Sequence, residues 1–206
     1  MRQGLRSWAS AAVAAALVLG AGVGAKTKTT VQHDKTFDFT GLRTYTWRLE
    51  GANPIKLLQS TADDPVEIRK VFEPMILAAV DQELAQKGFT RVSSGEAELY
   101  LDYYVLIGPG MTSQYQGQFV GAVPAWGLPD FAMSTTSLSI YEQGSILIDV
   151  NSTKLRQLVW RAAADAKVDR SRTQAQRVAL VNGVIKDMLK KFPPKFKKQA
   201  ASKSEK

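Results

Sequence analysis

The sequence contains no cysteine and only one histidine, His33, among its 206 residues. Without cysteine the chain has neither disulfides nor a thiolate nucleophile, and it lacks the residue that bacterial lipoproteins acylate. Zinc sites normally need three or four convergent nitrogen or sulfur ligands, so a single histidine argues strongly against zinc. We therefore expect no bound metal and no other cofactor.

Several motifs of catalysis and ligand binding are also missing. No G-x-S-x-G elbow supplies a nucleophilic serine for His33 to activate. The glycine-rich "GPG" at 108–110 is followed by no helix and no lysine, so it is not a phosphate-binding loop. The stretch "DVNST" at 149–153 faintly resembles a calcium loop but lacks the later glycine and glutamate.

Long apolar runs are scarce, and the one that exists is N-terminal. After Arg2 and Arg6, the run "SWASAAVAAALVLGAGVGA" extends over 7–25 without a charge. Small residues precede Lys26, as at a signal cleavage site. We predict a signal peptide over 1–25 and a periplasmic or secreted protein. The alternative is an uncleaved inner-membrane anchor, since about 20 apolar residues can span a bilayer.

The net charge of +8 is unevenly distributed along the chain. The segment 190–206 holds seven lysines and one glutamate, whereas the body over 26–189 is balanced. Nucleic-acid-binding domains carry their charge on a folded face, so we expect no nucleic acid partner. We predict a basic disordered tail over 195–206, with attraction to an anionic membrane surface as the sharper alternative.

The periodicity of the body predicts an α+β domain over 26–194. One helix begins after Asp64, carries an apolar stripe that continues across Pro74, and ends at Gly88. A second helix, with its own apolar stripe from Val178 to Phe192, runs from about Thr173 to the prolines at 193–194. Alternating segments at 29–33 and 44–47 precede the first helix, and 50–62 is interpreted as a loop. Between the helices lie a short strand at "FTRV" and longer strands at 99–106, 137–150 and 156–168. We expect a mostly antiparallel sheet of about five to six strands, with both helices on one face.

Residues 108–136 follow no period, although they are rich in glycine and proline and hold several aromatic residues. A loop of this length inside a compact domain is usually functional or disordered. Aromatic rings stack on sugars and peptides, but they also fold back onto cores. Tyr115, Trp126 and Phe131 are therefore the candidate ligand-binding residues.

Asp102 and Asp149 occupy polar positions in otherwise apolar strands. If those strands are neighbours, the two carboxylates come close together, as in a glycosidase. Arg161 and Lys167 lie on the strand that follows Asp149, and a cross-strand ion pair is the commoner reason for opposite charges in a hairpin. We therefore assign no catalytic residue.

A series of fragments resembles the bacterial envelope family named domain of unknown function 4136. The fragments, in order, are "FDFTGLRTYTW", "LAQKGF", "AELYLDYYV", "YEQGSILIDV", "QLVWRAAADAKV" and "KKFPP". The resemblance covers roughly 28–194 and depends on the order and spacing of these fragments. It implies an exported protein, often a lipoprotein, although this chain lacks the lipid-bearing cysteine. It implies no activity and no catalytic residues.

Together these observations favour a non-catalytic binding or scaffolding domain of the cell envelope. Its partner would be an envelope protein, a glycan or an anionic membrane surface, contacted through the 108–136 loop or a sheet edge. The alternative is a periplasmic hydrolase that uses carboxylates such as Asp102 and Asp149.

Overall fold

The computed structural model describes residues 27–50, 52, 54–57, 64–107, 145–165 and 172–196. The predicted signal peptide over 1–25, the loop over 108–136 and most of the basic tail lie outside these residues. No helix within the described ranges is long and apolar enough to span a bilayer.

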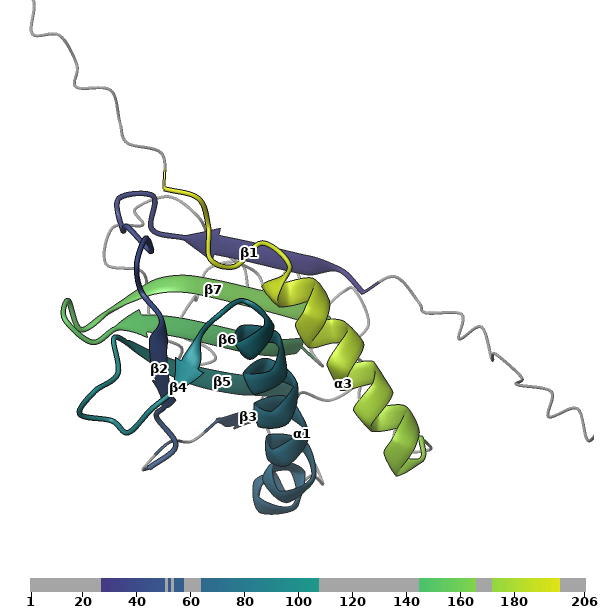
Figure 1. Ribbon diagram of the computed structural model, residues 1–206. Helices are drawn as coiled ribbons and strands as arrows, with labels where there is room; N and C mark the ends of the chain where they lie inside the picture. The colour runs from purple at the N-terminus through teal and green to yellow at the C-terminus, as the bar shows by residue number, and fades with distance from the viewer. Residues whose placement is uncertain are drawn as a thin grey trace, which may run out of the picture.

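The described residues form an α+β fold built on one mixed sheet (Figure 1). Its seven strands are β1 (Thr29–His33), β2 (Thr44–Trp47), β3 (Ile55–Leu57), β4 (Thr90–Arg91), β5 (Leu99–Ile107), β6 (Ser145–Ser152) and β7 (Gln157–Asp165). Their order is β1-β7-β6-β5-β2-β4, with β3 pairing β5 beside β2. The long ladders β1–β7, β6–β7 and β5–β6 are antiparallel, whereas β2–β4, β2–β5 and β3–β5 are short and parallel.

The predicted fold class is confirmed, but two details of the prediction are wrong. The sheet formed by the described residues has seven strands rather than five or six. The extra strand, β3, lies within 50–62, where the sequence predicts a loop. Its three residues are too few to show a period, and they become a strand because they pair with the edge of β5.

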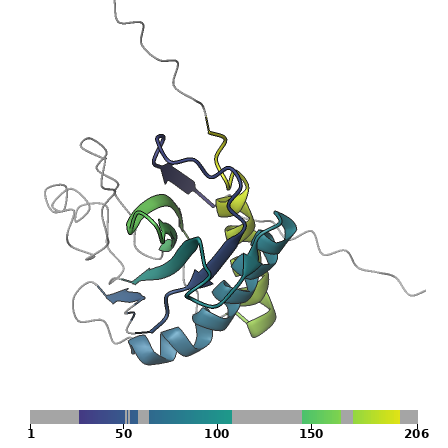
Figure 2. The same ribbon diagram turned by 60° about the vertical axis from the view of Figure 1, so that its left-hand side comes forward.

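Both described helices, α1 (Pro65–Gln86) and α3 (Gln174–Leu189), cover the same face of the sheet (Figures 1 and 2). The side chain of Asp64 caps α1 by accepting from the N–H of Val66 at 2.8 Å. Thr173 and Gln176 form a reciprocal capping box at the start of α3. Gly88 follows α1 with a φ of 79°, a backbone conformation that suits glycine.

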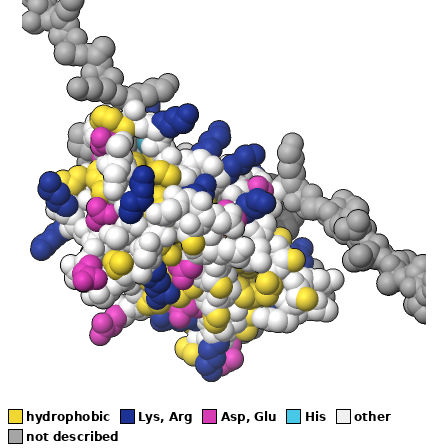
Figure 3. All heavy atoms as spheres, in the orientation of Figure 1, with side chains coloured by type: hydrophobic (Ala, Val, Ile, Leu, Met, Phe, Trp, Pro, Cys, Tyr) yellow, Lys and Arg dark blue, Asp and Glu magenta, His cyan; other side chains and the backbone are white. Residues whose placement is uncertain are grey.

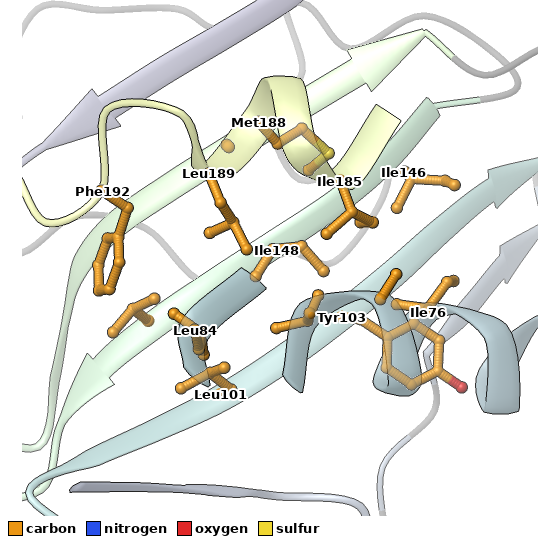
Figure 4. Close-up of a cluster of buried hydrophobic side chains, with 14 of the residues drawn as sticks. Ile76, Leu84, Leu101, Tyr103, Ile146, Ile148, Ile185, Met188, Leu189 and Phe192 are labelled. Carbon is orange, nitrogen blue, oxygen red and sulfur yellow. The ribbon is translucent and has the colours of Figure 1, made fainter. Parts of the chain in front are cut away.

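The main core lies between the helices and this face of the sheet (Figure 4). Alternate residues of β5 and β6 point toward the helices, among them Leu101, Tyr103 and Ile148. They meet the apolar stripes of α1 and α3, which pack against each other as well. The predicted stripes are therefore the buried faces of both helices.

Two carboxylates of α1 anchor this helix to tyrosines of the sheet. Asp81 accepts from the hydroxyl of Tyr45 at 2.7 Å and from the indole N–H of Trp47 at 2.9 Å. Two turns earlier, Glu73 accepts from the hydroxyl of Tyr103 at 2.6 Å. Burial, followed by these hydrogen bonds, raises the pKa of both tyrosine hydroxyls. The hydroxyls therefore stay protonated and act as fixed donors that set the position of α1.

Candidate functional site

The two aspartates singled out by the sequence lie side by side on the sheet face that points away from the helices. Asp102 of β5 is the register partner of Asp149 of β6, and Asp149 is in turn the partner of Arg161 of β7. The condition that the two strands are neighbours is thus met. Polar side chains of three adjacent strands form one row across the centre of the sheet.

Asp149 and Arg161 form the cross-strand ion pair that the hairpin predicts. The guanidinium donates from Nε to Oδ1 at 2.6 Å and from Nη2 to Oδ2 at 2.5 Å. The two side chains are 0% and 6% exposed, respectively. This geometry is the two-pronged arrangement in which arginine binds carboxylates most strongly.

Asp102 is held by a second arginine, which no pattern in the sequence indicates. Arg48, the residue after β2, donates from Nε to Oδ1 at 3.0 Å and from Nη2 to Oδ2. Asn151 of β6 adds a hydrogen bond from Nδ2 to Oδ2 at 3.0 Å. The side chain of Arg48 is 52% exposed, so this half of the row reaches solvent whereas the Asp149 half does not.

Electrostatics inside the row are dominated by burial. Burial raises the pKa of the Asp149 carboxyl to about 6, and the hydrogen bonds and charge of Arg161 oppose this rise. Burial also raises the pKa of Tyr104, which lies close to the charges of both aspartates. No carboxylate of the row is left without an arginine partner.

The arrangement does not suit acid–base hydrolysis. A glycosidase needs one protonated and one ionised carboxyl group, both facing the substrate. Here each carboxylate is bound by a guanidinium, and Asp149 is fully buried. The row is well suited to fixing the register of β5, β6 and β7, because a slip of one residue would leave a charge unpaired in the interior.

We expect the titration of Asp149 to depend on Arg161. Its folded-state pKa of about 6 lies above the unfolded value of about 3.9, so the stabilisation that Asp149 provides is complete at acid pH. This contribution is lost as the pH rises from about 4 through about 6. The change Arg161→Met should raise the pKa of Asp149 further, as measured by the pH dependence of its ¹³C carboxyl shift.

Asp38 provides the control for this titration. Its hydrogen bonds with Thr40, one of them from the backbone N–H at 2.8 Å, hold the pKa of Asp38 below its usual range. The pKa of Asp38 should be the same in the wild type and in Arg161→Met. If the pKa of Asp149 in the wild type were below that of Asp38, the lowering of this pKa by Arg161 would outweigh the rise caused by burial.

The comparison with known protein families gives a match that covers most of the chain. The family model described as "Domain of unknown function (DUF4136)" matches residues 29–194. The chain belongs to this family. The resemblance found in the sequence is thereby confirmed, and the matched range includes every strand and helix described above.

The solved structures that this DUF4136 chain resembles are distant from it in sequence. A PDZ domain protein from Parabacteroides distasonis ATCC 8503 is 17% identical, with a TM-score of 0.43, over 82% of this chain and 35% of that one. The match therefore spans about a third of that protein. The PelC dodecamer from Paraburkholderia phytofirmans is 10% identical, with a TM-score of 0.40, over 79% of this chain and 94% of that one. No curated protein matches the chain.

The other candidate residues of this DUF4136 domain fall into two groups. Tyr115, Trp126, Phe131 and Lys167 lie outside the described residues. His33 is exposed at the end of β1, on the edge of the sheet. Within the described ranges, no group of three or more histidine, aspartate or glutamate side chains is placed to hold a metal ion.

Proposed function

We propose that this protein is an exported, envelope-associated domain that binds or scaffolds a partner and has no catalytic activity. One observation carries the proposal. The only pair of sheet carboxylates that suggested hydrolysis is bound by Arg48 and Arg161, and Asp149 is inaccessible to a substrate. The membership of a family without an assigned activity is consistent with this reading.

The surface that supports binding best is the open edge of the sheet at β1. This strand ends the order β1-β7-β6-β5-β2-β4, and its central Val31 is 37% exposed. Exposed strand edges bind extended partners through main-chain hydrogen bonds. On the face seen in Figure 3, basic and acidic side chains are interspersed, unlike the basic stripe of nucleic-acid-binding proteins.

Export is a separate part of the proposal and has its own test. The charge-free run over 7–25 supports a signal peptide that is removed after Ala25. N-terminal sequencing of protein collected from the periplasm should begin at Lys26. A chain that begins at Met1 would instead support the anchored alternative.

Binding and hydrolysis are separated by two variants with opposite expected effects. Asp102→Asn removes one carboxylate of the suspected pair, and the exposed position of Arg48 limits the cost to folding. Val31→Pro removes an outward N–H of β1, a position where edge strands tolerate proline. We expect envelope components retained by the immobilised wild type to be retained by Asp102→Asn and lost with Val31→Pro.

The same proteins should be incubated with extracted envelope glycans and peptides, with turnover followed by mass spectrometry. We expect no turnover by the wild type. Turnover that Asp102→Asn abolishes, with its circular dichroism spectrum unchanged, would establish the hydrolase in place of the binding domain. Retention unaffected by Val31→Pro would exclude β1 as the contact surface.

A further inference from the structure

The strand β1 is the one sheet edge among the described residues that is both long and without protection. Sheet edges are usually blunted by short strands, prolines or charges. The opposite edge, β4, has two residues, and β3 has three. By contrast β1 has five residues, "TTVQH", with no proline and no acidic or lysine side chain.

The hydrogen-bond pattern of β1 shows which backbone groups face outward. Asp165 donates its N–H to the carbonyl of Lys28 at 3.1 Å, and Asp34 donates its N–H to the carbonyl of Val159 at 2.9 Å. Hydrogen-bonded residues alternate along an antiparallel strand, so the even-numbered residues of β1 face β7. The N–H and carbonyl groups of Thr29, Val31 and His33 therefore point out of the sheet.

We infer that β1 pairs antiparallel with β1 of a second copy of this chain, with Val31 of each copy at the two-fold axis. This register places Thr29 opposite His33 of the second copy and pairs all three outward-facing residues. Each such pair exchanges two hydrogen bonds, and the two sheets become continuous. It also brings the exposed Val31 side chains together, which favours a packed cross-strand contact.

Charge complementarity favours a second copy of this chain as the partner of β1. In the register centred on Val31, Lys28 lies opposite Asp34 of the second copy, and symmetry repeats this contact. Both residues are even-numbered and form non-hydrogen-bonded pairs, in which facing side chains are closest. The carboxylate of Asp34 is held in place by Thr36, whose backbone N–H donates to Oδ1 at 2.8 Å.

This inference rests on the proposed function, since it names the partner that meets the β1 edge. It requires a symmetric, self-complementary interface, which is the commonest arrangement in homodimers. An unrelated partner would need only the outward-facing backbone groups. The charges at Lys28 and Asp34 therefore distinguish a second copy from another protein.

The first test measures the mass of the exported protein by light scattering over about a hundredfold dilution, where mass action separates dimer from monomer. We expect twice the mass of one chain at high concentration. Val31→Pro should raise the dissociation constant at least about tenfold, because it removes two outward N–H groups per dimer. The matched control, Val31→Thr, keeps the N–H and the strand propensity and should remain dimeric.

The second test exchanges the charges and remains decisive if Val31→Pro fails to fold. Lys28→Asp places two aspartates opposite each other, and Asp34→Lys does the same with two lysines. Each variant alone should dimerise about tenfold more weakly, because like charges directly opposite are unfavourable and occur twice. An equal mixture of the two restores both opposite-charge contacts and should dimerise like the wild type.

The outcomes separate this inference from the function it rests on. A wild type that is monomeric throughout, or a dimer that neither Val31→Pro nor the charge variants weaken, overturns the self-pairing. If a monomeric wild type still retains an envelope component that Val31→Pro does not retain, the proposed binding function stands and only the self-pairing is wrong. A dimer restored by mixing the charge variants supports the pairing and its register.

Discussion

Replacing Arg161 by methionine while Asp149 remains will destabilise the fold by about 3–5 kcal/mol at neutral pH. The ion pair is almost completely buried, so the change leaves a carboxylate without a partner inside the protein. Asp149→Leu should cost a similar amount, because it removes the carboxylate that forms the buried ion pair with the guanidinium. Both values are read from urea unfolding, with the slope checked against the wild type.

The double variant Asp149→Leu/Arg161→Met should unfold at a free energy within about 1 kcal/mol of the wild type. Desolvation of two charges offsets most of their attraction, so an apolar pair of similar volume is nearly equivalent. As a control, Lys70→Gln removes a solvent-exposed ion pair with Glu67 and should leave the unfolding midpoint unchanged. A double variant that costs as much as the two single changes together would show that the two charges are not coupled.

This ion pair shows which part of the site the sequence could predict. Asp149 and Arg161 are twelve residues apart in a hairpin, and the short turn between their strands fixes the pairing. The alternation of apolar residues predicted the strands β6 and β7, and the opposite charges on these strands predicted the ion pair. The sequence of the hairpin alone is therefore sufficient to predict the contact between Asp149 and Arg161.

The pairing of Asp102 with Arg48 could not be predicted in the same way. These residues are 54 positions apart, and their contact depends on the parallel pairing of β2 with β5. No local pattern specifies which distant strand lies beside β5 or in which direction it runs. The same lack of local information hid β3, whose three residues become a strand only beside β5.

The helices were predicted best because their signals are local. The cap at Asp64, the stripe across Pro74 and the glycine at Gly88 predict one helix, and α1 extends over Pro65–Gln86 without interruption. The caps and stripe of α3 are equally direct. Phe192, beyond the end of α3, belongs to the same apolar stripe, but its contacts come from segments far away in the sequence.

Phe192→Ala is expected to destabilise the fold by about 3–5 kcal/mol, because it removes a buried aromatic ring and leaves a cavity. The ring of Phe192 lies 5.0 Å from Trp160, 5.4 Å from Phe89 and 5.7 Å from Phe39, measured between ring centroids. It therefore connects the end of α3 to β7 and to the segments that follow β1 and α1. Thermal and urea unfolding of the purified protein will measure the loss.

Phe196→Ala is the matched control, since Phe196 is four residues further along the chain and 39% exposed. It should change the free energy of unfolding by no more than about 0.5 kcal/mol, as surface substitutions usually do. Phe192→Leu keeps most of the volume and should cost less than Phe192→Ala. Equal effects of Phe192→Ala and Phe196→Ala would mean that Phe192 contributes no more to the core than the exposed Phe196. The expected difference would instead show that Phe192 belongs to the core and that Phe196 does not.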